Sequence, residues 1–184
     1  DRASWEAYYK PRLRADDPLR LASGPAWEMQ LAEWLRPDRE YPLFIEAGSL
    51  YGVARNWFGL EGISQIMYDD RDLFEEVVAT LADVVVTVLE HTLSAGVRPE
   101  AASMWEDMCF SGGPLMSPKI FKEVLVPHYQ RITGTLNRYG VDIIFLDCDG
   151  KIDALAPLWL EAGVNTMFPI EVGKWKADPL EFRH

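Results

Sequence analysis

Acidic residues follow several short apolar runs of this sequence, an arrangement that places carboxylates at the ends of buried strands. The clearest example is Asp147-Cys148-Asp149-Gly150, which follows the run Asp142–Leu146. Like-charged carboxylates that are held close together raise the pKa of one of them. A carboxyl group that keeps its proton in this way suits general acid catalysis, and an ionised pair suits the binding of a cation.

The spacing of this motif assigns different faces to its members. Asp147 and Asp149 are two residues apart, so on a continuing strand their side chains share one face. Cys148 then points the opposite way, toward the helices, where it packs rather than binds a ligand. Gly150 lets the backbone turn sharply after the acids. Acid sites that bind hard cations and acid sites that form hydrogen bonds look alike in sequence, so we predict no metal ligands from this pattern.

The other predicted strands also deliver an acid at the same end. Glu46 ends the first strand, Glu106 and Asp107 follow the second, and Glu171 follows the fourth. In β/α barrels the carboxyl ends of the strands form the active site. The chain has 29 Asp and Glu residues, so chance placement in a surface loop competes for each acid taken singly. The joint pattern favours a site.

The apolar pattern predicts strands and helices in alternation. Short apolar runs bounded by Gly, Pro or acids predict buried strands, and i, i+3, i+4 spacing between caps predicts helices. The predicted strands are 42–48, Ala101–Trp105, Asp142–Leu146 and Asn165–Phe168. The predicted helices are Leu50–Phe58 and Gly62–Met67, split by Gly59, then a long helix from a cap at Asp69-Asp70 to Gly96, and Pro118–Tyr139 and Ile152–Ala162.

The helix that starts at Ser117-Pro118 has two further predicted features. A serine cap followed by proline is a favoured helix start, and the N-terminus of a helix can bind an anion such as a substrate carboxylate. The competing interpretation is an ordinary serine cap after the polar loop Glu106–Met116. Pro127 lies inside this helix, and its ring should clash with the carbonyl of Glu123, so we predict a kink there.

The order of elements predicts the fold class, an α/β protein built as a TIM-type (β/α) barrel. Alternating strands and helices are typical of a parallel sheet. Four predicted strands are fewer than the eight of a closed barrel, which needs about 250 residues. We therefore predict a partial barrel, either truncated or completed by a partner that supplies the missing strands. The chain reads as a single domain, 1–184, with an irregular lead-in over 1–40, helical near Ser4–Tyr9 and Ala26–Leu35, and strand–helix repeats over 41–184.

Composition limits the classes of function. The 184 residues carry a net charge of −11, which argues against nucleic acid, because phosphate binding needs clustered Lys and Arg. No run approaches the roughly 20 apolar residues of a membrane helix, and the start of the chain lacks the apolar core of a signal peptide. Cys109 and Cys148 lie far apart and form no CxxC pattern. We therefore expect a reduced, cytoplasmic protein.

Several motifs resemble blocks of the uroporphyrinogen decarboxylase family. The first block is carried by Trp105-Glu106-Asp107-Met108, Gly113–Pro118 and Val126-Pro127-His128-Tyr129; the second is carried by Asp147–Gly150, Ala162–Asn165 and Phe168–Glu171. The resemblance runs from about Asp1 to Val172 and is specific in order and spacing from Trp105 to Glu171. That family adopts a TIM barrel, so the resemblance implies the same fold class as the strand pattern.

The resemblance implies one of two chemistries. One branch of the family decarboxylates the acetate side chains of uroporphyrinogen without a cofactor. The other comprises corrinoid-linked methyltransferases that use a zinc-bound thiolate acceptor. Their His-x-Cys zinc motif corresponds to Asp147 and Asp149, so the thiol-activating zinc site is not visible in this sequence. The decarboxylase pattern departs too, because the position of its catalytic tyrosine holds Asn56, with Tyr51 nearby.

Our main hypothesis from the sequence is a carboxy-lyase of the decarboxylase type that acts on a tetrapyrrole, with no organic cofactor. In it, carboxylates would accept hydrogen bonds from pyrrole N–H groups or position the acid that protonates the product. The expected catalytic residues are Asp147, Asp149, Glu106 and Asp107. The expected substrate-binding residues are Glu46, Tyr51, Trp105, Ser117, Gly150 and Glu171.

Two alternatives accompany this hypothesis. The first is a corrinoid-dependent methyltransferase of the same family, for which zinc or a corrinoid would be required; its acids would bind a metal or protonate a demethylated leaving group. The second is a partial barrel without catalytic activity. The expected partners are a small-molecule substrate such as a tetrapyrrole, a corrinoid protein under the methyltransferase alternative, and a second copy of the chain in a homodimer. Nucleic acids and membranes are not expected partners.

Overall fold

A four-stranded parallel sheet lies at the centre of the structure, a computed structural model that describes residues 1–183. The strands are β1 (Phe44–Glu46), β2 (Ala101–Trp105), β5 (Ile144–Asp147) and β6 (Thr166–Phe168), in the order β1-β2-β5-β6. Each lies within two residues of a strand predicted from the sequence. The predicted parallel α/β arrangement is confirmed, whereas the described residues form an open sheet and no closed barrel is seen.

The register of the sheet separates its two faces. Trp105 pairs with Asp147, and Asp147 pairs with Phe168, so these three side chains lie side by side on one face. The neighbouring positions face the other way and are mostly buried: Ala102, Met104, Ile144 and Leu146 are buried, and Ile45 and Met167 pack against the core. The core therefore lies on one side of the sheet, and Asp147 lies on the other.

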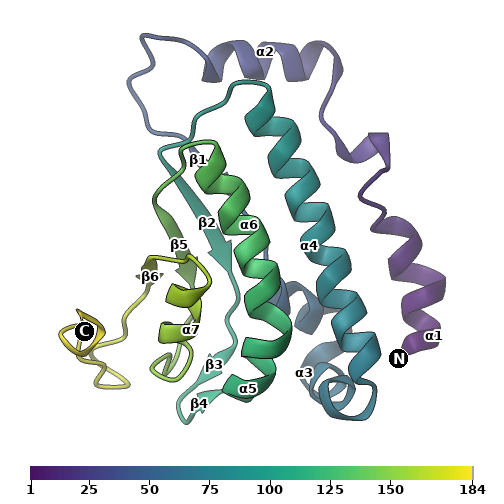
Figure 1. Cartoon of the computed structure of the whole chain (residues 1–184), viewed down its shortest axis with the longest axis vertical. Helices are drawn as coiled ribbons and strands as arrows, with labels where there is room; N and C mark the ends of the chain where they lie inside the picture. The colour runs from purple at the N-terminus through teal and green to yellow at the C-terminus, as the bar shows by residue number, and fades with distance from the viewer. Residues whose placement is uncertain (184) are drawn as a thin grey trace.

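Helices and short helical turns connect and flank the strands. They are α1 (Arg2–Ser4), α2 (Gly24–Trp34), α3 (Tyr51–Asp69), α4 (Arg71–Ser94), α5 (Pro118–Ile120), α6 (Val126–Arg138) and α7 (Ala156–Glu161); shorter helical turns are η1 (Trp5–Tyr9), η2 (Lys10–Arg12), η3 (Pro18–Arg20), η4 (Phe121–Leu125) and η5 (Glu181–Arg183). Figure 1 shows α4 and α6 side by side in front of the sheet, with the strands pointing toward α3 and with α2 crossing the opposite end.

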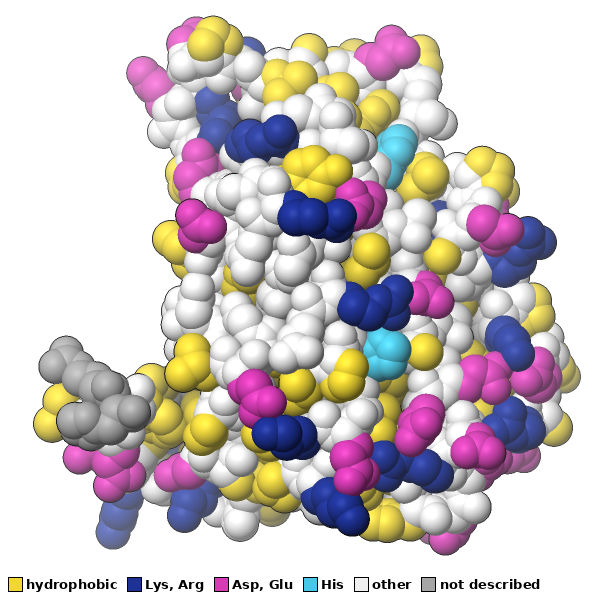
Figure 2. Space-filling model, viewed as in Figure 1, with side chains coloured by type: hydrophobic (Ala, Val, Ile, Leu, Met, Phe, Trp, Pro, Cys, Tyr) yellow, Lys and Arg dark blue, Asp and Glu magenta, His cyan; other side chains and the backbone are white. Residues whose placement is uncertain are grey.

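Acidic and basic side chains are interspersed over the outer surface of α4 and α6 (Figure 2). Arg71 pairs with Glu75 and Glu123, and Arg131 pairs with Asp83. Such exposed pairs contribute little stability each. They place part of the chain's acid on the exposed surface.

Two predicted irregularities in the helices are confirmed. Gly59 interrupts α3 with φ 73° and ψ 163°, which breaks the element where the sequence predicted two helices. The helix that begins at Pro118 contains the π-helical turn η4 just before Pro127. Pro127 has no N–H to donate and its ring excludes the carbonyl four residues earlier, so the wider turn relieves the clash predicted at Glu123.

Two predictions of local structure were wrong in extent. The loop predicted over Glu106–Met116 contains a small antiparallel hairpin formed by β3 (Cys109–Phe110) and β4 (Gly113–Pro114). The helix predicted over Ile152–Ala162 is shortened to α7, because residues 153–155 form a turn and Pro157 fits only the first turn of a helix.

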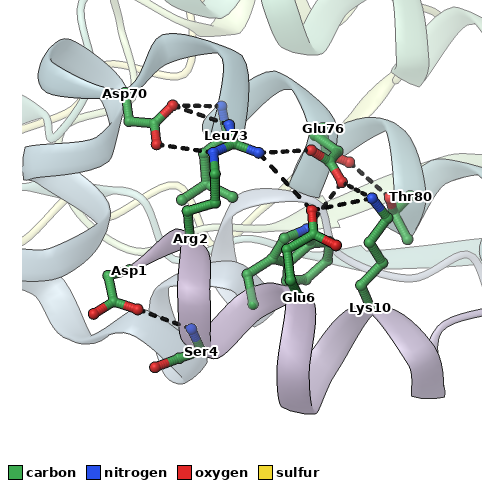
Figure 3. Close-up of polar contacts among 10 residues, drawn as sticks. Asp1, Arg2, Ser4, Glu6, Lys10, Asp70, Leu73, Glu76 and Thr80 are labelled. Carbon is green, nitrogen blue, oxygen red and sulfur yellow. Dashed lines mark hydrogen bonds and ion pairs between the residues drawn. The ribbon is translucent and has the colours of Figure 1, made fainter.

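An ionic network fastens the amino-terminal segment to α4 (Figure 3). Arg2 pairs with Asp70 at 3.0 Å and with Glu76 at 3.1 Å, and Lys10 pairs with Glu76 at 2.6 Å. The indole N–H of the buried Trp5 also donates to Glu76. Asp70 caps α4 by accepting from the amide of Leu73, as predicted. The helical stretch predicted near Ser4–Tyr9 is thus confirmed, and it packs against the core.

Candidate functional site

The carboxyl ends of β2, β5 and β6 meet at one edge of the sheet, beside a cleft of about 660 Å³. Four of the acids and glycines predicted for a site line it, namely Asp107, Asp149, Gly150 and Glu171. The fold thus brings these four predicted residues together at one cleft, and their roles stay predictions. Residues that it did not single out complete the walls: Arg55 and Gly59 from α3, Cys109 and Phe110 from β3, and Lys174 and Trp175 after β6.

Arg55 is held firmly at the wall of the cleft. Its guanidinium pairs with the Asp107 carboxylate at 3.0 Å and donates to the backbone carbonyl of the same residue. It also lies over the ring of Trp105, with 5.6 Å between the guanidinium carbon and the ring centroid. Asp107 itself has a φ of 42°, a left-handed conformation that aspartate tolerates better than most residues. The Trp105-Glu106-Asp107 turn is thereby stabilised around a cation.

Among the acids at or beside the cleft, Asp147 has a raised pKa. Its half-buried side chain lies between Trp105 and Phe168 in the sheet register. Burial raises the pKa of Asp147, and the nearby negative charges of Asp149 and Asp107 raise it further. Among the described residues neither Asp147 nor Asp149 forms an ion pair within 4.0 Å. The effect of Asp149 on the pKa of Asp147 has the direction that the spacing of the two acids predicted.

A hydrogen bond between Glu171 and Gly150 joins two segments that line the cleft. The Glu171 carboxylate accepts from the amide of Gly150 at 2.6 Å and from the indole N–H of Trp175. Gly150 has a φ of 89°, and a Cβ there would lie 2.7 Å from the carbonyl carbon and oxygen of Cys109. Only glycine fits this close approach of two backbone segments. Glu171 is placed to orient the loop that carries Asp149.

Replacing Gly150 with alanine should lower the free energy of unfolding by roughly 2–4 kcal/mol, because the new methyl group meets backbone and requires a left-handed conformation. Gly173 is the matched control, since a Cβ there meets nothing within 4 Å and its φ is not in the left-handed region. Gly173→Ala should therefore change stability by less than about 0.5 kcal/mol. Denaturant titration of both variants measures the difference, and equal midpoints would contradict the predicted contact.

Glu106 is a correction to the predicted set of catalytic acids. Its side chain is fully buried and does not line the cleft. The carboxylate accepts from the amides of Leu50, Tyr51 and Gly52 at the start of α3, and from the hydroxyls of Ser49 and Tyr129. Burial raises the pKa of Glu106, and these donors oppose the rise. Glu106 thus positions α3 and α6 and does not face a substrate.

Four of the predicted substrate-binding residues do not line the cleft. Tyr51 is fully buried; burial raises its pKa to about 12, and its hydroxyl has no hydrogen-bond partner among the described residues. Ser117 caps the helix that follows it by accepting from Ile120, the ordinary role that competed with anion binding. Glu46 is exposed at the end of β1, and Trp105 supports Arg55. The roles of these four in binding stay predictions.

A family model identifies the chain. The model of the uroporphyrinogen decarboxylases (URO-D) matches residues 29–171, a span that includes all four strands of the parallel sheet and the acids of the cleft. This chain belongs to the uroporphyrinogen decarboxylase family. The resemblance of its motifs, noted from the sequence, is thereby confirmed.

One solved structure resembles this family member. It is described as a methyltransferase from Methanosarcina mazei, and the two share 17% sequence identity with a TM-score of 0.56. The match covers 76% of this chain and 39% of the methyltransferase, so the chain spans about two fifths of that protein's length. The likeness supports a shared fold. None of the curated proteins matches the chain, and within residues 1–183 no helix is long and apolar enough to cross a membrane.

The residues of this family member do not fit the zinc ion of the corrinoid-linked branch. The two positions that correspond to its His-x-Cys motif hold the hard oxygen ligands Asp147 and Asp149. Cys148, between them, points into the core, as its spacing predicted, and is fully buried. Within residues 1–183 no group of three or more His, Cys, Asp or Glu side chains is arranged to hold a metal. We therefore derive no catalytic step through zinc.

Proposed function

We propose that this member of the uroporphyrinogen decarboxylase family forms part of a TIM-type barrel enzyme that removes a methyl group from a small molecule. A corrinoid protein would be the partner that accepts the methyl group. The observation that carries the proposal is the charge of the cleft. Asp107, Asp147, Asp149 and Glu171 lie at or beside it, whereas Arg55 and Lys174 are the cations among its described lining residues.

This charge balance disfavours the tetrapyrrole hypothesis. Uroporphyrinogen, the substrate of the decarboxylase branch, carries eight carboxylates. The four acids at or beside the cleft would repel these carboxylates. Of the two cations that line the cleft, Arg55 is already paired with Asp107. Lys174 has no carboxylate partner among the described residues. The structural similarity to a methyltransferase agrees with the proposed methyl transfer, but the proposal does not depend on it.

The mechanism that we propose assigns a proton to Asp147. When a methyl group leaves an oxygen or nitrogen atom, the electron pair of the broken bond stays on that atom, which then takes up a proton. A carboxyl group with a raised pKa keeps such a proton to higher pH than an ordinary carboxyl group does, and it can deliver the proton to the leaving atom. Burial raises the pKa of Asp147, and the neighbouring Asp149 raises it further. Glu171 and Gly150 hold Asp149 in place.

Two assays with the full-length protein separate the chemistries. In the first, the protein is mixed with cob(I)alamin and a panel of methoxybenzenes and methylated amines, and loss of the cob(I)alamin absorbance is followed together with the demethylated product. In the second, the protein is incubated with uroporphyrinogen, and coproporphyrinogen is measured. We expect demethylation in the first assay and no product in the second. Conversion of uroporphyrinogen without demethylation of any probe would contradict the proposal.

A further inference from the structure

Two cysteines that lie far apart in the sequence meet beneath the cleft. Cys109 belongs to β3, and Cys148 follows β5 between the two acids of the site. Both are free, buried thiols, and the nearby Cys148 raises the pKa of the Cys109 thiol. The amide of Met108 also donates to the Cys148 sulfur at 3.4 Å. The proposed methyl transfer uses neither thiol.

The backbone segments that carry the two thiols are tied together on both sides. The amide of Glu106 donates to the carbonyl of Asp147, and the amide of Lys151 donates to the carbonyl of Phe110, each at 3.0 Å. In this register Cys148 lies beside Asp107, and Cys109 lies beside Gly150, two residues further along. The Cys148 sulfur accepts from the amide of Met108, the residue that precedes Cys109, so the side chain of Cys148 extends toward Cys109. A disulfide between them needs their Cα atoms roughly 4.4–6.8 Å apart.

The two thiols differ in their access to solvent. Cys109 lines the cleft and is 5% exposed, whereas Cys148 is 0% exposed and belongs to the core. A small oxidant that enters the cleft therefore reaches Cys109 first. Cys148 stands directly behind it as the second thiol that a disulfide requires.

We propose that Cys109 and Cys148 are a modification site, a dithiol that a peroxide converts into an intramolecular disulfide. In the first step the Cys109 sulfur attacks the O–O bond of the peroxide, becoming a sulfenic acid while one water is released. In the second step the Cys148 thiol attacks that sulfur, the S–S bond forms and a second water leaves. Two sulfur atoms lose two electrons in total, and hydrogen peroxide gains them.

The surroundings of Cys109 set the pH dependence of this reaction. Its contact with Cys148 raises the pKa of the Cys109 thiol; burial raises it too, and the nearby charges of Asp107 and Asp153 act in the same direction. Arg55 and Asp149 also line the cleft. The thiolate is the reactive form, so the oxidation should be slow at neutral pH. Its rate should rise about tenfold for each unit of pH below the pKa.

The disulfide would join the hairpin of β3 and β4 to the segment that carries Asp147 and Asp149. It would close a long loop of the chain, which restricts the unfolded state. We therefore expect oxidised protein to melt roughly 5–10 °C higher than reduced protein. This effect does not depend on the enzymatic activity, so it tests the thiol pair separately from the proposed function.

The experiment treats native full-length protein with hydrogen peroxide over a range of pH, then counts thiols after denaturation and maps disulfide-linked peptides. We expect both thiols to disappear together, a single linked peptide pair containing Cys109 and Cys148, and recovery of both thiols with dithiothreitol. Cys109→Ser and Cys148→Ser are the matched variants. Each should form no intramolecular bridge and should show no rise in melting temperature after peroxide.

Several results would overturn the proposal. Both thiols could survive at peroxide concentrations that oxidise an exposed control thiol. They could also be lost only as sulfinic or sulfonic acids or as bridges between molecules, with no linked peptide pair within the chain. A Cys148→Ser protein that gains the same thermal stability as wild type would exclude the disulfide as the cause. If either variant fails to fold, the peptide map of the wild-type protein still decides.

Discussion

Replacing Glu106 with alanine should lower the free energy of unfolding by about 4 kcal/mol or more. The fully buried carboxylate accepts hydrogen bonds from three amides of the segment Leu50–Gly52 and from the hydroxyls of Ser49 and Tyr129. Each buried donor left without an acceptor costs about 1–3 kcal/mol, and the lost side chain leaves a cavity besides. Chemical denaturation followed by circular dichroism measures the change.

Graded variants test the cause of this loss. Glu106→Gln keeps the shape but turns an NH₂ group toward amide donors, so it should cost roughly 2–3 kcal/mol. Tyr129→Phe removes a single hydroxyl, which donates at 2.6 Å, and should cost about 1–1.5 kcal/mol. Glu28→Ala, exposed on α2, is the control and should change stability by less than about 0.5 kcal/mol. An alanine variant within about 1 kcal/mol of wild type would contradict the positioning role.

The sequence predicted the structure well where residues close together in the chain determine the local conformation. Apolar runs that end in an acid located the strands, and the i, i+3, i+4 spacing after Asp70 located α4. Alternation placed Cys148 in the core and Asp147 on the opposite face. The same alternation applied to Trp105-Glu106-Asp107 would have turned Glu106 inward. That correction was therefore available from the sequence, and the error came from treating adjacent acids as one group.

Contacts between distant segments were beyond the sequence. Arg55 lies in α3, and nothing local indicates that its guanidinium will reach Asp107 and Trp105. The meeting of Cys109 with Cys148 depends on the hairpin of β3 and β4, whose two-residue strands are too short to give a period-two pattern. Such features depend on how the strand-end loops fold over the sheet, and a single sequence without covarying positions carries no information on that packing.

Asp147→Asn should reduce the proposed methyl transfer by about 10²–10⁴-fold, the usual contribution of a general acid. Asparagine keeps the shape of the side chain but has no acidic proton to deliver to the leaving atom. The loss should be smallest for probes with a weakly basic leaving atom, which need least help from a proton; a variant that lost activity through misfolding would lose it equally for all probes. Asp142→Asn, exposed just before the same strand, is the matched control and should retain activity.

The pH profile gives this assignment its sharpest test. A general acid works in its protonated form, so activity should fall as pH rises through the raised pKa of Asp147. Because the negative charge of Asp149 helps to raise that pKa, Asp149→Asn should lower it and move the falling limb to lower pH. The substitution thus removes a neighbouring charge while leaving the acid itself in place. A falling limb that stays unchanged in Asp149→Asn, or that persists in the residual activity of Asp147→Asn, would assign the proton to a different group.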